Sequence, residues 1–167
     1  KIKDIFTRVL KGHIAVASFK LNKNSYGDRI DQSARKFLRD INLDYPHGTG
    51  HGVGYFSNVH EGPQAISKGN KVKFREGMIT SNEPGYYKKN HFGIRIENLV
   101  YVKKTRDKLK FEDLTLVPID KTLIEKKLLT SFEKNWLNKY HQKVFSKLKT
   151  FMNKFELTQL KQACSNI

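Results

Sequence analysis

A glycine occupies every second position from residue 48 to residue 54, within the segment His47-Gly-Thr-Gly-His51-Gly-Val-Gly54. Glycine destabilises the interior of a helix because it loses more backbone entropy on folding than any other residue. Four alternating glycines therefore exclude a stable helix here and favour a loop, or a strand in close contact with neighbouring backbone. The segment separates a part of the chain with helical periodicity from a part with strand-like runs.

Apolar residues before Leu43 recur at helical spacing. Residues 2–20 are predicted to form a core-facing helix that includes His13, and a lone histidine among apolar helical positions indicates a structural role. Asp28 is predicted to cap a second helix, whose inner face follows from the spacing of its apolar residues. These residues are Ile30, Ala34, Phe37, Leu38 and Ile41.

After the glycine-rich segment the pattern favours strands, with turns predicted at residues 83–85 and 88–91. The predicted strands are Met78–Asn82, Gly93–Val102 and Leu109–Val117. Beyond Pro118 the pattern returns to helix, with an apolar stripe that favours a core or an interface. The stripe comprises Phe132, Trp136, Tyr140, Val144, Leu148, Met152 and Phe155. The order helix, helix, strands, helix predicts an α+β fold with an antiparallel sheet.

The formal net charge of +16 is spread along the 167 residues. Residues 1–45 carry 10 basic and 5 acidic side chains (+5), residues 46–118 carry 12 and 7 (+5), and residues 119–167 carry 10 and 4 (+6). An even distribution favours a generally solvated basic surface over a stripe that binds nucleic acid. Nucleic acid is therefore not the expected partner.

The length allows one domain with its own core, or part of a larger domain. The chain starts at Lys1 without an initiator methionine, which we take as the mark of a fragment or a processed product. No run approaches the roughly 18 apolar residues of a membrane span, and no signal-peptide pattern opens the chain. Cys164 is the single cysteine, which excludes an intrachain disulfide and fits a cytoplasmic location.

The glycine-rich segment fails the tests for phosphate-binding loops. A G-x-G-x-x-G pattern would need glycine in place of Val53 or Tyr55, and no Gly-Lys-Ser/Thr follows. His47 and His51 have the spacing of the zincin pair, but that motif requires a helix and a glutamate after the first histidine. The terminal position of Cys164 and the absence of G-x-S-x-G argue against nucleophilic catalysis.

His51, Glu83 and Glu97 remain as candidate metal ligands, each from a different strand or turn. Histidine nitrogen together with carboxylate oxygen suits divalent zinc, manganese or iron. The glycines around His51 would let the backbone pack closely and would aim the imidazole. His47 and His60 would then bind substrate or move protons near neutral pH.

Four phrases in a fixed order carry a family resemblance: HGTGHGVG at 47–54, NVHEGP at 58–63, SNEPGYY at 81–87 and GIRIEN at 93–98. Together they resemble the C-terminal part of the Xaa-Pro aminopeptidases (aminopeptidase P). The resemblance implies the creatinase/aminopeptidase-like pita-bread fold, here partial, with a curved antiparallel sheet flanked by helices. Residues 1–118 would be the C-terminal portion of the catalytic domain. Residues 119–167 would be the helical C-terminal extension typical of the cytosolic-type enzymes.

The resemblance implies release of the N-terminal residue from peptides with proline in second position, by attack of a metal-bridging hydroxide. Two divalent ions, Mn²⁺ with Zn²⁺ and Co²⁺ as alternatives, would be held by two aspartates, one histidine and two glutamates. His51, Glu83 and the bridging Glu97 match this set, and Glu83 would also accept the proton of water. His47 and His60 would be catalytic residues that contact the substrate. Arg95 would orient the carboxylates through charge-assisted hydrogen bonds.

The two aspartate ligands are expected upstream of residue 1, because none of the eight aspartates present stands in the family's context ahead of the first helix. We therefore expect this chain alone to be inactive or nearly so. An incomplete sheet would expose an apolar edge, which predicts a homodimer or pairing with an N-terminal portion. The alternative function is a non-catalytic pita-bread module that binds protein or nucleic acid, against which the three retained ligands argue.

Overall fold

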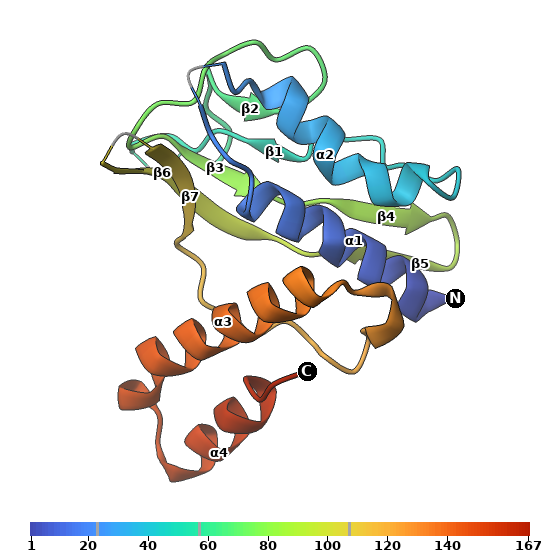
Figure 1. Cartoon of the computed structure of the whole chain (residues 1–167), viewed down its shortest axis with the longest axis vertical. Coiled ribbons are helices and arrows are strands. Elements are labelled where there is room, and N and C mark those ends of the chain that lie inside the picture. Colours follow the sequence, from blue (N-terminus) through green and yellow to red (C-terminus); the bar gives the residue numbers. More distant parts are fainter. Residues whose placement is uncertain (23, 57, 107) are drawn as a thin grey trace. The chain divides into compact units, whose positions relative to one another are not determined.

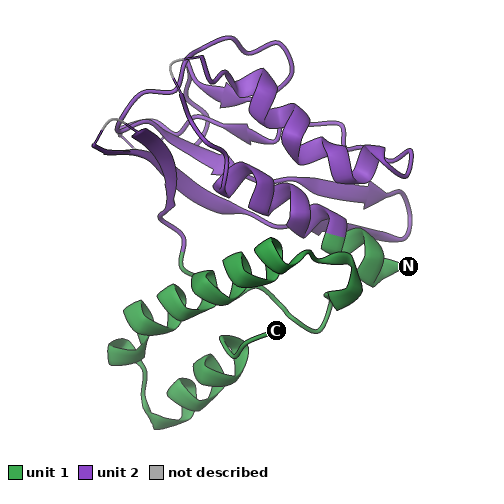
Figure 2. Cartoon of the chain, viewed as in Figure 1, with its two compact units in different colours: residues 1–7, 116–167 green, residues 8–115 purple. Residues whose placement is uncertain are grey.

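The computed structural model describes residues 1–22, 24–56, 58–106 and 108–167, which form two compact units (Figure 2). Unit 1 comprises residues 1–7 and 116–167, and unit 2 comprises residues 8–115. The first helix, α1 (Ile2–Ala17), contributes to both units. All the residues predicted to bind metal or substrate belong to unit 2.

Unit 2 places α2 (Gly27–Arg39) beside α1, and both helices lie along the strands (Figure 1). The helices approach closely at Gly12, where a Cβ would come within 2.6 Å of the Ala34 carbonyl oxygen. The two predicted helices are confirmed, but the predicted cap is wrong. Tyr26 precedes α2, and the Asp28 carboxylate instead accepts hydrogen bonds from the Gly69 amide (2.8 Å) and the Gln32 side chain (2.9 Å).

The described strands of unit 2 pair in antiparallel fashion, which confirms the predicted α+β class. β3 (Ile79–Asn82), β6 (Asn98–Thr105) and β7 (Lys108–Asp113) form one sheet in the order β3-β6-β7. β1 (Gly50–His51) pairs with β2 (Ala65–Ile66), and β4 (Gly85–Lys88) pairs with β5 (Phe92–Arg95). A bridge between Gly52 and Thr80 joins β1 to β3.

Two of the predicted strands differ from those observed. The strand predicted over Gly93–Val102 is divided into β5 and β6, because the Ile96 amide donates to the Pro84 carbonyl (3.3 Å) and leaves both ladders. The strand predicted over Leu109–Val117 ends at Asp113, where the Thr115 hydroxyl accepts from the Leu99 amide (2.9 Å) in place of a backbone partner. The β4–β5 hairpin was not predicted as a pair.

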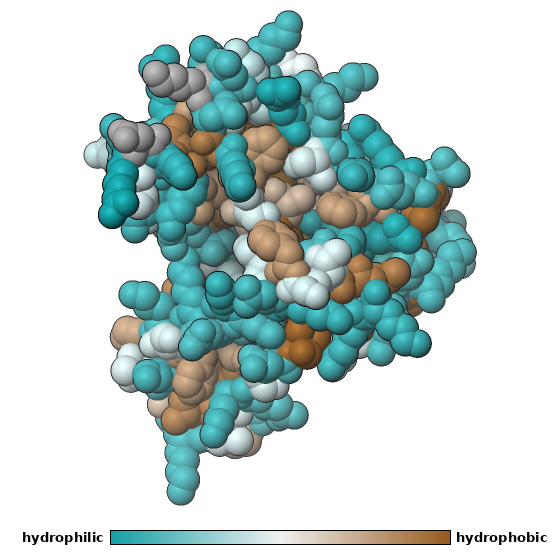
Figure 3. Space-filling view, in the orientation of Figure 1, coloured by the Kyte–Doolittle hydropathy of each residue, from teal (hydrophilic) through white to brown (hydrophobic). Residues whose placement is uncertain are grey.

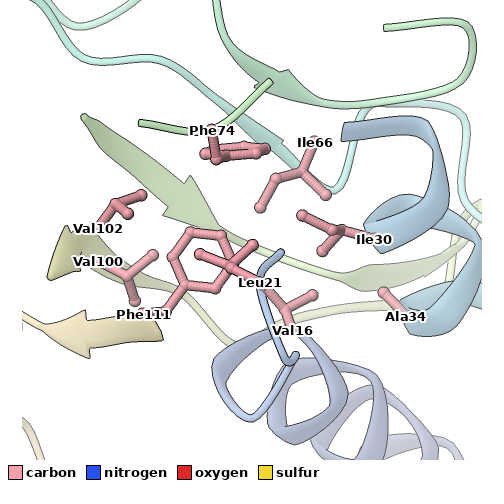
Figure 4. Close-up of a cluster of buried hydrophobic side chains, with 9 residues drawn as sticks. All are labelled: Val16, Leu21, Ile30, Ala34, Ile66, Phe74, Val100, Val102 and Phe111. Atoms are coloured by element: carbon pink, nitrogen blue, oxygen red, sulfur yellow. The ribbon is translucent and has the colours of Figure 1, made fainter. Parts of the chain in front are cut away.

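A cluster of nine buried side chains holds both helices of unit 2 against its strands (Figure 4). They are Val16, Leu21, Ile30, Ala34, Ile66, Phe74, Val100, Val102 and Phe111. The rings of Phe74 and Phe111 meet edge to face, with centroids 5.4 Å apart. Each large apolar side chain contributes roughly 1.5–3 kcal/mol when fully buried. This cluster therefore fixes the sheet from which the candidate site residues project.

Unit 1 contains a short 3-10 turn (Lys126–Leu128), α3 (Ser131–Leu148), a second 3-10 turn (Lys149–Phe151) and α4 (Lys154–Ala163). Both α-helices begin with a capping box, formed by Thr130 with Glu133 and by Asn153 with Glu156. Among the helices of the described residues, none has the length and apolar character needed to span a membrane.

The predicted apolar stripe of unit 1 is only partly buried. Tyr140 and Val144 belong to the core, whereas Phe132 and Phe155 are 61% and 73% exposed. Phe132 lies in the first turn of α3, whereas Phe155 lies on α4, because α3 ends at Leu148 and the four-residue spacing does not continue along one helix. Figure 3 shows apolar side chains among hydrophilic ones over the α3–α4 region.

One histidine in each unit is fully buried, His13 in unit 2 and His141 in unit 1. The Nε2 atom of His141 accepts a hydrogen bond from the Ile119 amide (3.1 Å). Burial lowers the pKa of His141 to about 4, and burial likewise lowers the pKa of His13 to about 4. Both rings are therefore neutral in the folded chain at neutral pH.

We expect the free energy of unfolding to fall as the pH drops from about 6.5 to about 4, because the unfolded chain then protonates both histidines and the folded chain does not. His141→Gln keeps a hydrogen-bond acceptor and removes one titration, so it should recover up to about 2 kcal/mol of the acid-induced loss. Urea unfolding at pH 7 and at pH 4.5, followed by the fluorescence of Trp136, measures the difference. The same pH dependence in both chains would contradict this account.

Candidate metal centre

The three predicted ligands lie together at the end of the β3–β6 ladder. Ligand atoms of His51, Glu83 and Glu97 are all within 4.8 Å of one another. In the register of this ladder Asn82 pairs with Asn98, so Glu83 directly follows β3 and Glu97 directly precedes β6. The antiparallel pairing thus places the two glutamates side by side at the point where the regular ladder ends.

Close backbone packing brings His51 to the same place. The His51 amide donates to Ser81 Oγ (2.9 Å), and Thr80 Oγ1 donates to the His51 carbonyl (2.8 Å). A Cβ at Gly50 would overlap the carbonyl oxygen of Ser81, so only glycine allows β1 to lie this near β3. This is the close backbone contact that the alternating glycines indicated.

The hydrogen bonding of His51 sets its tautomer. Its Nδ1 lies 3.0 Å from the Gly52 carbonyl oxygen, and because a carbonyl only accepts, Nδ1 carries the hydrogen of the neutral ring. The lone pair of Nε2 then faces Glu83 Oε1 at 3.2 Å. Two electron-rich atoms at this distance need a cation between them, either a proton or a metal ion. The donor set therefore fits a divalent ion held by nitrogen and carboxylate oxygen.

Glu83 is held much more firmly than Glu97. Its Oε1 accepts from Ser81 Oγ (2.9 Å), its Oε2 lies 3.2 Å from Arg95 Nη1, and its amide donates to the Thr49 carbonyl (2.8 Å). Its side chain is 9% exposed, whereas Glu97 is exposed. Arg95 thus contacts one of the carboxylates that it was predicted to orient.

Arg95 also begins a hydrogen-bonded chain to His47. Its Nε donates to the Tyr87 hydroxyl (2.8 Å), and that bond is the main cause that raises the pKa of Arg95. The Tyr87 hydroxyl in turn donates to His47 Nε2 (2.9 Å), while His47 Nδ1 donates to the Gly48 carbonyl (2.7 Å). Tyr87 was missed as a site residue, although it stands in the phrase SNEPGYY (81–87), which carried part of the family resemblance.

His60 completes the group, with its ring centroid 4.2 Å from that of His51. A hollow of about 320 Å³ brings most of the predicted site residues to one surface. It is lined by His47, Gly48, Gly50, His51, His60, Glu83 and Arg95. This volume lies at the lower end of the range of ligand pockets.

Arg35 on α2 supports the segment that bears His47, a role that the sequence did not predict. Its Nε donates to Asp31 (2.8 Å) and its Nη1 donates to Asp44 (2.7 Å) and to the Tyr45 carbonyl (2.8 Å). Its Nη2 donates to the His47 carbonyl. Asp31 also accepts from the hydroxyl of Thr49 (2.7 Å), so one buried ion pair fixes both ends of this segment.

We expect Arg35→Met to lower the free energy of unfolding by about 3 kcal/mol or more, because it leaves the buried Asp31 carboxylate without its cation. Arg39→Met is the matched control, since Arg39 is 50% exposed and its Nε bonds Asp44 Oδ2 (2.9 Å), whereas Asp44 Oδ1 bonds Arg35. That change should cost about 1 kcal/mol or less. Urea unfolding of both variants tests the difference, and equal losses would refute the assigned role of Arg35.

The matches to known proteins agree with this geometry. Residues 1–104 match metallopeptidase family M24, and residues 107–167 match the C-terminal region of peptidase M24. A probable Xaa-Pro aminopeptidase P from Sclerotinia sclerotiorum is 46% identical, over 93% of this chain and 28% of its own length. Aminopeptidase P2 from Arabidopsis thaliana is 47% identical, over 87% of this chain and 22% of its own length. The chain spans about a quarter of the length of these relatives.

A solved structure matches nearly the whole of this chain. The X-prolyl aminopeptidase of Caenorhabditis elegans, described as a cytosolic enzyme with a di-nuclear active site, aligns with a TM-score of 0.91 and 40% identity. The alignment covers 99% of this chain and 29% of the other. The predicted pita-bread fold is thereby confirmed, with this chain forming part of it.

Proposed function

The chain belongs to metallopeptidase family M24, and we propose that it supplies three metal ligands of an Xaa-Pro aminopeptidase. The observation that carries the proposal is the convergence of His51, Glu83 and Glu97 within 4.8 Å. Residues from three separate segments meet there, with the lone pair of a histidine facing a carboxylate. The retention of all three ligand residues at one place supports the metal-binding function over the alternative of a non-catalytic binding module.

We assign the centre two divalent ions, with Mn²⁺ as the preferred metal and Zn²⁺ or Co²⁺ as alternatives. When bound, such ions polarise the scissile carbonyl and lower the pKa of water. His51, Glu83 and Glu97 account for three of the five ligands expected in this family. The two remaining aspartates would come from outside residues 1–167.

We assign the residues of this chain different roles in the hydrolysis of the peptide bond before proline. Glu83 would accept a proton from water, and its contacts with Ser81 and Arg95 support this role by holding the carboxylate in one position. His47 and His60 line the same hollow and would contact the substrate. Tyr87 holds the Nε2 atom of His47, so the hydroxyl would set the direction in which that ring meets the peptide.

We also propose a cytoplasmic protein that works as a homodimer or together with an N-terminal portion. The single cysteine supports the location, as does the cytosolic description of the related C. elegans enzyme. The two aspartate ligands expected from outside residues 1–167 support the pairing with an N-terminal portion. The substrates would be peptides with an Xaa-Pro N-terminus.

Isothermal titration of residues 1–167 with Mn²⁺ tests the assigned ligands. Glu97→Gln should weaken binding at least about tenfold, because it removes one carboxylate charge from the centre. Glu112→Gln is the control, since Glu112 is a carboxylate of unit 2 on β7 that pairs with Lys110 (2.9 Å). Equal binding by all three proteins would rule out the assigned ligand.

Residues 1–167 with excess Mn²⁺ should show little or no hydrolysis of a peptide with proline in second position, because two carboxylates are lacking to hold both ions. If the coding sequence before Lys1 supplies the two aspartates, the longer chain should hydrolyse the peptide and Glu97→Gln should abolish its activity. Turnover by residues 1–167 that disappears in Glu97→Gln would show that three ligands are sufficient.

A further inference from the structure

Both candidate glutamates lie where the chain leaves its strands. Glu83 stands between β3 and β4, and Glu97 stands between β5 and β6. The two breaks contact each other through the Ile96 amide, which donates to the Pro84 carbonyl (3.3 Å). Regular strand pairing therefore stops at Glu83 and Glu97, so strand hydrogen bonds do not fix the distance between these two proposed ligands.

His13 on α1 contacts both breaks, in each case through the residue that precedes the glutamate. Its Nδ1 lies 3.2 Å from the carbonyl oxygen of Ile96, the residue before Glu97. Its own backbone carbonyl accepts from Nδ2 of Asn82 (3.0 Å), the residue before Glu83. His13 and Asn82 are both fully buried, so water does not compete for these bonds.

The helix that carries His13 is a fixed reference for both segments. Gly12, its neighbour, lies against the backbone of Ala34 on α2, and Val16, one turn further, belongs to the core cluster. The two bonds from this helix therefore hold both breaks at a fixed place relative to the core. They join residues 83 positions apart (His13 and Ile96) and 69 positions apart (His13 and Asn82).

Histidine suits this place because it can donate while neutral. The Ile96 carbonyl only accepts, so Nδ1 carries the hydrogen. Burial lowers the pKa of His13 to about 4, which keeps positive charge away from the neighbouring segments at neutral pH. A lysine or arginine in this position would bring a buried charge close to the metal site.

We propose that His13 and Asn82 form a positioning pair that sets the separation of Glu83 and Glu97, and with it the affinity of the centre for divalent metal. The inference rests on the proposed metal-binding function. It concerns residues that contact neither metal nor substrate and act through the backbone next to each glutamate.

Four variants of residues 1–167 separate this role from ordinary packing. His13→Leu removes the donor at similar volume, whereas His13→Asn keeps a donor close to the position of Nδ1. Asn82→Ala removes the second bond and provides an independent test if His13→Leu does not fold. His141→Leu is the control, because it removes another fully buried histidine, which belongs to the other unit.

The first measurement is amide hydrogen exchange of the metal-free chain, read at Glu83 and Ile96, whose amides donate to Thr49 and Pro84. His13→Leu removes the bond to Ile96 and should accelerate exchange at the Ile96 amide at least about tenfold, and His13→Asn should restore it. Asn82→Ala removes the bond to the His13 carbonyl and should accelerate exchange at the Glu83 amide by a similar factor. The amide of Val102, which donates to Met78 (2.9 Å) in the core of unit 2, reports general destabilisation. Unchanged exchange at Ile96 in His13→Leu and at Glu83 in Asn82→Ala, or an equal acceleration at Val102, would overturn the proposal.

The second measurement is Mn²⁺ affinity by isothermal titration. His13→Leu and Asn82→Ala should weaken binding about 10- to 100-fold, with His13→Asn within about threefold of the unaltered chain and His141→Leu unchanged. Binding that depends on Glu97 but not on His13 or Asn82 would refute the positioning pair and leave the proposed function intact. If the chain binds no Mn²⁺ in a Glu97-dependent way, the ligand assignment fails instead, and the exchange data alone decide on the pair.

Discussion

The register of β3 against β6 is the constraint on which the centre depends. It pairs Thr80 with Val100 and Asn82 with Asn98, and thereby leaves Glu83 and Glu97 side by side beyond the last pair. Val100 and Val102 are buried in the core cluster on one face of β6. A slip of one residue would turn them to the opposite face, so the apolar core enforces the register that brings the carboxylates together.

The remaining donors reach the centre through close packing and one buried cation. Gly50 lets β1 approach β3 until the His51 amide bonds Ser81 Oγ, which also bonds Glu83. Arg35 holds the backbone of His47 by donating to its carbonyl. His47 and His51 lie on short segments with little regular pairing. The longer elements α2 and β3 hold these segments in place through Arg35 and Ser81.

Much of the fold and of the candidate site could be predicted from the sequence, because hydrophobic spacing indicates helices and strands and the four phrases indicate the ligand residues. The α+β class, both helices of unit 2 and the close packing at Gly50 were predicted correctly. The break before Asn98 and the roles of Tyr87 and Arg35 were not, since each depends on bonds between distant segments; the Tyr87 hydroxyl bonds a histidine 40 positions away. For Arg35 a signal existed, because Asp31 lies one helical turn before it on the face that carries Ala34.

The two glutamates differ in how their positions are fixed before any ion binds. Glu83 has bonded partners for both carboxylate oxygens, whereas the side chain of Glu97 is exposed. Fixing a free glutamate side chain costs up to about 2 kcal/mol of rotamer entropy, and fixing its backbone costs a similar amount again. The bond from His13 to the Ile96 carbonyl restrains the backbone of Glu97 in advance, so an arriving ion has to order the side chain only. A restraint on the backbone therefore matters more for Glu97, whose side chain is exposed, than for Glu83, whose carboxylate already has bonded partners.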